Sequence, residues 1–185
     1  MAVALKEAAQ PSFSSYIQQV QTNTRALASN LQSRNYTIVT DGTDNHIVLW
    51  DARSTGLSGA MIEKALEWCD ISANKNAIFG DTSALNPGGV RLGTLAMTTR
   101  GMNVTDMVWI GDMIHRVVQL AHRIHTHYQL NINADNAAAV SIIKRHPFVT
   151  DALGDQFWPS FMNLREEVRR YMRFFAVKSR FNAPP

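Results

Sequence analysis

The first 34 residues carry apolar side chains at the three- and four-residue spacing of an amphipathic helix. Pro11, followed by Ser12, interrupts that spacing, because proline has no amide donor and restricts the residue before it. We therefore predict a short helix and then a longer one that ends near Arg34. Their apolar positions are Leu5, Ala8, Tyr16, Val20, Ala26 and Leu31.

Two short runs of β-branched and aromatic residues follow this helical region. Residues 36–40 and 46–50 are such runs, and the sequence Asp-Gly-Thr-Asp at 41–44 is typical of a turn. We predict two strands that pair antiparallel across this turn. Asp44 and His46, at the entry to the second strand, are expected to be structural.

The middle of the chain predicts one more helix and then extended structure. Ser58 is a favourable N-cap for a helix that ends near Cys69, since its hydroxyl oxygen accepts a hydrogen bond from a free amide of the first turn. Residues 71–77 are expected to be extended. A turn-rich loop through Gly89 then leads to a strand at 90–92.

Helical spacing returns after this strand. Asn103 or Thr105 is expected to open a long helix that reaches about Tyr128. A shorter alanine-rich helix is predicted at 135–145, where His146-Pro147 ends it. The buried stripe of the long helix is predicted to contain Val108, Ile114, Val117, Val118, Ala121 and Ile124.

A last helix is predicted at about 158–175. Its apolar stripe indicates packing or docking, and a binding site for a flat cofactor is the alternative interpretation. The stripe consists of Phe161, Leu164, Val168, Tyr171 and Phe175.

The composition is that of a globular protein, with 45% hydrophobic residues. No apolar run approaches the roughly 20 residues of a membrane-spanning helix. The N-terminus lacks a basic start followed by an apolar core, so we expect no secretory signal, and the early Glu7 argues against a transit peptide. The single cysteine, Cys69, is expected to be a buried small hydrophobe, which fits a reducing compartment.

The formal net charge is +3, and the densest run of cations lies near the C-terminus. Helical spacing places part of this run on one face. A solvated helix face explains it, and weak contact with RNA phosphates or with an acidic partner is the second interpretation. The run consists of Arg165, Arg169, Arg170, Arg173, Lys178 and Arg180.

Three histidines are close enough in sequence to compare with a metal site. His122 and His125 share a helical face, but His127 points elsewhere, and no cysteine or aspartate completes a tetrahedral set. We therefore expect surface or interface histidines and no metal site.

The segment at 86–94, Asn-Pro-Gly-Gly-Val-Arg-Leu-Gly-Thr, carries the clearest candidate chemistry. The pair Gly88-Gly89 lets the backbone approach a ligand or another strand closely. Arg91 follows on a short strand, where a guanidinium suits two-point capture of a carboxylate. A structural or surface role for Arg91 is the other interpretation.

Five motifs occur in one order along the chain: Thr43-Asp44-Asn45-His46, Asn74-Lys75-Asn76, residues 80–85, Arg91-Leu92-Gly93-Thr94 and Thr98-Thr99-Arg100-Gly101. Their order and spacing resemble the C-terminal portion of serine hydroxymethyltransferase, a pyridoxal-phosphate enzyme. Residues 2–8 resemble a helix of that family, and residues 164–176 resemble its last helix. The match is weakest between about Gln129 and Ser160.

The resemblance implies a fold as well as a family. It predicts an α/β (α+β) small domain of a fold type I pyridoxal-phosphate enzyme, with a short, mainly antiparallel sheet packed against several helices. Residues 1–185 then form one domain with leading helices at 1–34, core motifs at 35–128, a divergent segment at 129–160, and the final helix and tail at 161–185.

The resemblance also assigns two site residues. Arg91 matches the arginine that grips the carboxylate of the amino-acid substrate, and Asn76 matches an asparagine near the folate. A purely structural role, without ligand binding, remains the alternative for both residues. The sequence departs from the family at Leu95, where proline is usual, and at 50–53, where Trp-Asp-Ala-Arg replaces an aliphatic residue followed by Asp-Leu-Arg. These departures are expected to touch the walls of the site.

In this family a large domain, N-terminal to the matched portion, holds the cofactor through a lysine, an acidic residue and a stacking ring. We expect this chain to bind no cofactor alone and not to be an enzyme by itself. Pyridoxal phosphate and tetrahydrofolate would bind only with a large-domain partner. The lysines that do not resemble the cofactor lysine are Lys6, Lys64, Lys75, Lys144 and Lys178.

The leading functional hypothesis is a truncated, non-catalytic domain that serves as a structural or interaction subunit beside other protein chains. A mitochondrial assembly is the expected setting, with the cytoplasm as the alternative. A second hypothesis is the C-terminal half of a split hydroxymethyltransferase that works with tetrahydrofolate and a separate large-domain chain. A third is regulatory binding of folate or an amino acid without catalysis.

Overall fold

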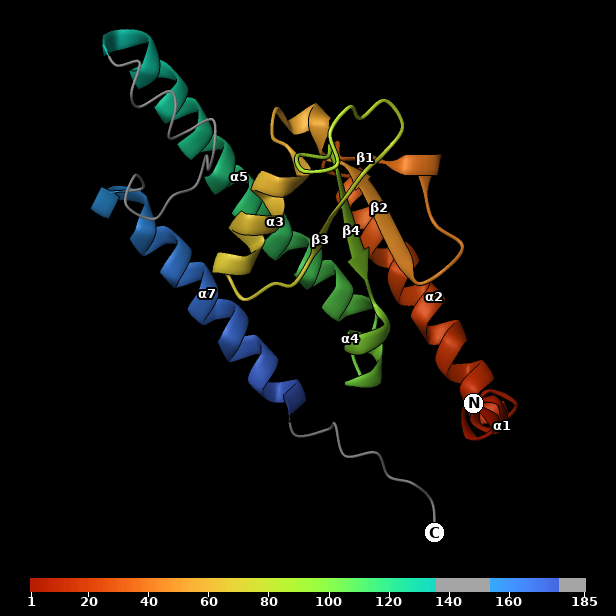
Figure 1. The fold of residues 1–185 in the computed structure, drawn as a ribbon. Coiled ribbons are helices and arrows are strands. Elements are labelled where there is room, and N and C mark those ends of the chain that lie inside the picture. Colours follow the sequence, from red (N-terminus) through yellow and green to blue (C-terminus); the bar gives the residue numbers. More distant parts are fainter. Residues whose placement is uncertain (136–153, 177–185) are drawn as a thin grey trace.

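The computed structural model describes residues 1–135 and 154–176. Helices come first and last in this range, and the short strands lie between them with α3 in their midst (Figure 1). The elements are α1 (Ala2–Ala8), α2 (Pro11–Gln32), β1 (Thr37–Ile38), η1 (Val39–Asp41), β2 (Ile47–Asp51), η2 (Ala52–Thr55), α3 (Gly59–Trp68), β3 (Asn74–Asn76), β4 (Gly89–Gly93), α4 (Leu95–Thr99), α5 (Val104–Asp135) and α7 (Gly154–Ala176).

The four strands form one antiparallel sheet in the order β1-β2-β4-β3. In the central pair, Trp50 lies opposite Val90 and Leu49 lies opposite Arg91. Because side chains alternate between the two faces of a strand, this register separates one apolar face from one mixed face. The architecture is the mixed α/β small domain, with a short antiparallel sheet and several helices, that the sequence predicts.

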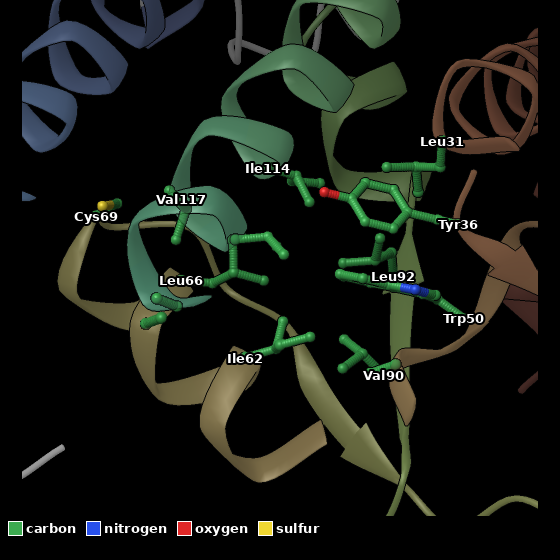
Figure 2. Packing of buried hydrophobic residues seen from close by; sticks show 14 of the residues in the cluster. Leu31, Tyr36, Trp50, Ile62, Leu66, Cys69, Val90, Leu92, Ile114 and Val117 are labelled. Atoms are coloured by element: carbon green, nitrogen blue, oxygen red, sulfur yellow. The ribbon is translucent and has the colours of Figure 1, made fainter. Parts of the chain in front are cut away.

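The core lies between the apolar face of the sheet and helices α2, α3 and α5. Trp50, Val48 and Val90 have no exposed surface, because the helices cover this side of the strands. Figure 2 shows sheet residues Trp50, Val90 and Leu92 turned toward Leu31 of α2, Ile62 and Leu66 of α3, and Ile114 of α5.

A buried asparagine fixes α4 against α2. The side-chain amide of Asn23 donates hydrogen bonds to Thr98 Oγ1 and to the carbonyl of Met102, both at 2.9 Å, and its oxygen accepts one from Gln19 at 2.9 Å. Every polar atom of this fully buried amide therefore has a partner, as a buried polar group requires. The contact holds the turn that follows β4 in place.

Helix α7 closes the other side of the core. Phe161 is fully buried, and its ring meets the ring of Trp68 edge-on with centroids 5.1 Å apart. Asp70, just after α3, forms ion pairs with Arg165 at 2.9 Å and Arg169 at 2.5 Å. These two arginines hold the pKa of the Asp70 carboxyl below its usual range, with the Arg165 hydrogen bond as the largest cause.

Several predictions from the sequence are confirmed. The helix break at Pro11, the antiparallel pairing of the first two strands and the N-cap at Ser58 are all present, and Ser58 Oγ accepts from the Met61 amide at 3.3 Å. The apolar stripe of the last helix is confirmed too, since Phe161, Leu164 and Val168 are buried. Cys69 is a buried residue as predicted, and burial raises the pKa of its thiol to about 12.

Other predictions are wrong or incomplete. The strand expected at 36–40 ends at Ile38, because Thr40 and Asp41 adopt positive φ angles of 66° and 55°. Val108 is 40% exposed, and the stripe of α5 starts instead at Met107, seven residues before Ile114. The short helices η2 and α4 were not predicted.

Two boundaries also differ. Helix α5 continues past Tyr128 to Asp135, and α7 begins at Gly154 rather than near Trp158. The remainder of the helix predicted at 135–145 lies outside the described residues. Within the part of the chain that the structure describes, no helix is long and apolar enough to cross a membrane.

Gly59, the first residue of α3, packs closely against residues 87–89, and this contact can be tested by substitution. The amide of Gly59 donates to the carbonyl of Pro87 at 2.8 Å, and a Cβ at Gly59 would lie 2.1 Å from the carbonyl oxygen of Gly89. Gly59→Ala is therefore expected to lower the free energy of unfolding by at least about 1–3 kcal/mol, because the backbone at Gly89 or at the start of α3 must move. Urea denaturation measures this change.

The matched control is the same substitution at Gly93, where the nearest atom to the added Cβ is a carbonyl oxygen at 3.9 Å. Gly93→Ala is expected to change the free energy of unfolding by no more than about 0.5 kcal/mol. Equal effects of the two substitutions would contradict the close contact at Gly59.

The docking of α7 gives a second prediction. Phe161→Ala is expected to cost about 3–5 kcal/mol of unfolding free energy, because the whole ring is buried against the core. Met162→Ala, at a neighbouring side chain that is 37% exposed, is expected to change it by about 0.5 kcal/mol at most. Thermal or urea denaturation of both variants measures these changes. If neither substitution destabilised the protein, α7 would not be packed against the core in solution.

Candidate functional site

The face of the sheet that points away from the helices is the candidate site, and we refer to it as the open face. Alternation along each strand gives it a mixed surface of apolar, amide and charged side chains that are exposed or half-exposed. Its members are Ile47, Leu49 and Asp51 of β2, Asn74 and Asn76 of β3, and Arg91 of β4.

Arg91 stands at the middle of the open face. Its backbone lies between Leu49 of β2 and Asn74 of β3, and its side chain is exposed. Within the described part of the chain it takes part in no ion pair and no side-chain hydrogen bond. The guanidinium therefore keeps its donors available for an anion from outside.

Asn76, the other predicted site residue, lies on the same face. It pairs with Gly89, two residues before Arg91, so Asn76 and Arg91 are diagonal neighbours across β3 and β4. Such neighbours lie roughly 7–8 Å apart, within reach of long side chains. The Asn76 side chain donates to the carbonyl of Ala77 at 2.7 Å, which orients its amide locally. The structure thus brings both predicted residues onto one surface.

The glycine pair before Arg91 allows close packing of the chain against itself. A Cβ at Gly88 would lie 2.7 Å from Arg53 Cδ, and one at Gly89 would lie 2.6 Å from the carbonyl oxygen of Asn76. Of the two explanations for the pair, approach to a ligand or to another strand, the structure shows the second, since Gly89 lies against β3. No larger residue fits either position without displacing a strand or Arg53.

An ion-pair cluster at the end of the open face was not predicted from the sequence. Arg53 donates to both carboxylate oxygens of Asp51, at 2.9 and 2.7 Å, and to the carbonyl of Phe79 at 3.2 Å. The Arg53 hydrogen bonds are the main reason that the pKa of Asp51 is lowered. The Asp-x-Arg spacing at 51–53 is the signal that predicts such a two-point pair.

Asp81 joins this cluster from the loop between β3 and β4. Its carboxylate accepts from the backbone amides of Ile78, at 2.8 Å, and Gly88, at 2.9 Å, which ties the two ends of the loop together. These amides, more than Arg53 at 3.9 Å, hold the pKa of Asp81 below its usual range. The loop is therefore fixed at the edge of the open face near Asn76.

The two residues that depart from the family pattern at 50–53 lie elsewhere than expected. Trp50 and Ala52 have no exposed surface and belong to the core, so they do not touch the open face. The Trp50 ring packs on Tyr36 with centroids 4.8 Å apart, because the register of β2 turns it to the helix side. Leu95 is 37% exposed at the start of α4, one residue beyond Thr94.

The described lysines do not fit a pyridoxal-phosphate site. Lys64 forms an ion pair with Glu67 at 2.8 Å, and the Lys75 amine donates to the carbonyl of Leu85 at 3.0 Å. Lys6 lies on α1, a helix without buried residues. None of these three amines lies in an enclosed site with a carboxylate and a ring for a cofactor, and Lys144 and Lys178 lie outside the described residues.

The C-terminal arginines are partly used within the fold. Arg165 and Arg169 pair with Asp70, and Arg173 lies 3.8 Å from Glu166. Arg170 is exposed, while Lys178 and Arg180 lie outside the described residues. The cationic face that the sequence predicts is therefore reduced by internal ion pairs, and contact with RNA stays a prediction.

The three histidines of α5 form no metal cluster within the described residues. His122 and His127 are exposed, whereas His125 is half-buried. Burial, and to a smaller extent the neighbouring His122, lower the pKa of His125.

Comparison with known proteins connects this fold to one family. The family model for serine hydroxymethyltransferase matches residues 1–114. The chain is 52% identical to serine hydroxymethyltransferase 5 of Arabidopsis thaliana over 128 residues, which cover 69% of this chain and 27% of that protein. It is 48% identical to the cytosolic serine hydroxymethyltransferase of Oryctolagus cuniculus over 124 residues, which cover 67% of this chain and 26% of the rabbit protein.

A third relative matches a longer part of the chain. A Neurospora crassa protein named as a mitochondrial serine hydroxymethyltransferase is 41% identical over 180 residues, which cover 93% of this chain and 32% of the relative. The chain thus spans about a quarter to a third of the length of these curated relatives. From the motifs, the fold and these matches, we conclude that the chain belongs to the serine hydroxymethyltransferase family.

Proposed function

We propose that the open face forms the substrate side of a hydroxymethyltransferase site, with Arg91 holding the carboxylate of serine or glycine. The cofactor-binding large domain that completes such a site would come from residues outside this chain. The observation that carries the proposal is the exposed guanidinium of Arg91 on an inner strand of the sheet, where it has no ion pair or side-chain hydrogen bond to any described residue. Arg53 and Arg165, by contrast, are held in ion pairs within the fold.

The strength of one arginine contact explains why a second domain is needed. A hydrogen-bonded pair with a charged group contributes about 1.5–3 kcal/mol, and such a contact alone corresponds to a dissociation constant of about 1 mM or weaker. Arg91 is exposed, so water competes for its donors. Covering the open face would exclude that water and strengthen the contact.

Asn76 and the loop beside it extend the same surface. Asn76 would lie near tetrahydrofolate, because it is on the Arg91 face and directly precedes the loop that Asp81 holds in place. Pyridoxal phosphate would supply the electron-sink chemistry from the large domain. The residues described in this chain would bind and orient substrate.

A non-catalytic structural subunit is the second candidate function. Phe79 is fully exposed and Leu85 is 84% exposed, on the loop beside the open face, and Ile47 and Leu49 are half-exposed on that face. Apolar surface of this kind indicates a covered interface whether or not catalysis occurs. Relatives carry both mitochondrial and cytosolic names, and we propose a mitochondrial assembly of protein chains with the cytoplasm as the alternative.

Substitution of Arg91 in a reconstituted pair separates the two candidates. The chain is co-expressed with the large-domain fragment of the Neurospora crassa relative, and serine-dependent glycine formation is measured with added tetrahydrofolate and pyridoxal phosphate. Arg91→Ala is expected to lower kcat/KM by about 10- to 100-fold, because the substrate carboxylate loses its cation. Co-elution of the two chains in gel filtration is expected to stay unchanged.

Arg123→Ala is the control, since Arg123 is an exposed cation on α5 with no ion pair among the described residues. It is expected to leave kcat/KM unchanged. A pair that co-elutes but has no activity with the wild-type chain supports the structural subunit. Loss of co-elution in Arg91→Ala would show that Arg91 is an assembly residue and would contradict its substrate role.

A further inference from the structure

A cavity of about 300 Å³ lies on the helix side of the sheet, between the end of β4, α4, α5 and α7. This is the face of β4 opposite to Arg91, because Leu92, and not Arg91, lines the cavity. The volume lies at the lower end of the roughly 300–1,000 Å³ that small-molecule sites occupy. The proposed function does not use this space.

The floor of the cavity is apolar and buried. Met107 has no exposed surface, and Ile114, Leu27 and Met113 are at most 4% exposed. Met97 and Met172 contribute from α4 and α7 and are half-buried. Methionine is unbranched and adapts its shape, so four methionines around one space favour a flexible aliphatic occupant.

The rim of the cavity is polar, and its groups differ in what they still offer. Asp70 is already neutralised by Arg165 and Arg169. Thr94 is buried, and its hydroxyl bonds with Thr24 at 2.6 Å. These groups leave little capacity for a ligand.

Arg100 differs from Asp70 and Thr94 in this respect. It is exposed at the C-terminal end of α4, and within the described residues it has no ion pair and no side-chain hydrogen bond. Its backbone is held by the carbonyls of Ala96 and Met97, so the guanidinium projects from a fixed turn. A fixed cation beside an apolar cavity matches a ligand with one anionic end and one apolar end.

We infer that this cavity binds a single-chain aliphatic carboxylate, with its hydrocarbon part among the methionines and its carboxylate on Arg100. Burial of the hydrocarbon supplies most of the affinity, since each buried methylene contributes about 0.8 kcal/mol. Arg100 supplies the orientation and selects an anionic head group. Binding at this place is independent of catalysis, so it does not rest on the proposed function.

Titration of octanoate into the 185-residue chain tests this inference by isothermal calorimetry. Saturable binding with one site per chain is expected, and Arg100→Ala is expected to weaken it about 10-fold, the equivalent of one charged hydrogen-bonded contact. Octylamine, which has the same chain and the opposite charge, is expected to bind at least 10-fold more weakly than octanoate. The matched control Arg123→Ala is expected to bind octanoate as the wild type does.

A cavity-filling substitution gives an independent readout. Ile110 is half-buried on the wall of the cavity, and Ile110→Trp is expected to remove octanoate binding while far-ultraviolet circular dichroism stays unchanged. The inference would be overturned by octanoate binding that survives Ile110→Trp, by equal affinities of wild type and Arg100→Ala, or by no saturable binding at millimolar octanoate.

Discussion

The register between β2 and β4 is the constraint on which the rest of this structure depends. It places Trp50 opposite Val90 on the helix side and Leu49 opposite Arg91 on the open side. A shift by one residue would place Arg91 opposite Trp50, so that either Arg91 would be buried or Trp50 exposed, and the buried face therefore strongly specifies the pairing. The position of the proposed substrate cation is thus a consequence of hydrophobic burial on the other side of the same strand.

Two glycines and one aspartate secure this register from the loop side. Gly88 and Gly89 permit the approach of Arg53 and of the β3 backbone, and Asp81 ties the loop through two amides. The Arg53–Asp51 pair then anchors the end of β2. Packing therefore explains most of the family motifs around residues 80–94. It does not explain Arg91, whose exposed side chain makes no such contact with the described residues.

Most of the fold could be predicted from the sequence, because its signals are local. Pro11 and Ser58 act within one helical turn, and alternation in β2 needs only neighbouring residues. The early end of β1 could not be predicted, since the β-branched Thr40 takes a left-handed conformation that its residue type seldom adopts. The exposure of Val108 depends on how α5 is rotated against the core, which periodicity over one helix does not fix to a single residue.

The site was predictable only in part. Arg91 and Asn76 came from motif resemblance, and the structure adds that they share a face. Asp81 joins the Asp51–Arg53 pair from 30 positions beyond Asp51, and the cavity beside Arg100 joins α2, the residues after α3, β4, α4, α5 and α7, so neither arrangement follows from local pattern. Trp50 is the opposite case. Its departure from the family motif predicts a place at the wall of the site, but the structure places it in the core.

The orientation of Arg91 can be measured directly by thiol labelling, because the one native cysteine, Cys69, is buried. Single substitutions Arg91→Cys and Val90→Cys are compared by their rates of reaction with a thiol reagent under native conditions. The cysteine at 91 is expected to react nearly as fast as in the unfolded chain, whereas the cysteine at 90 and native Cys69 are expected to be protected. A cysteine at 90 that reacts as fast as the one at 91 would contradict the register and, with it, the open face.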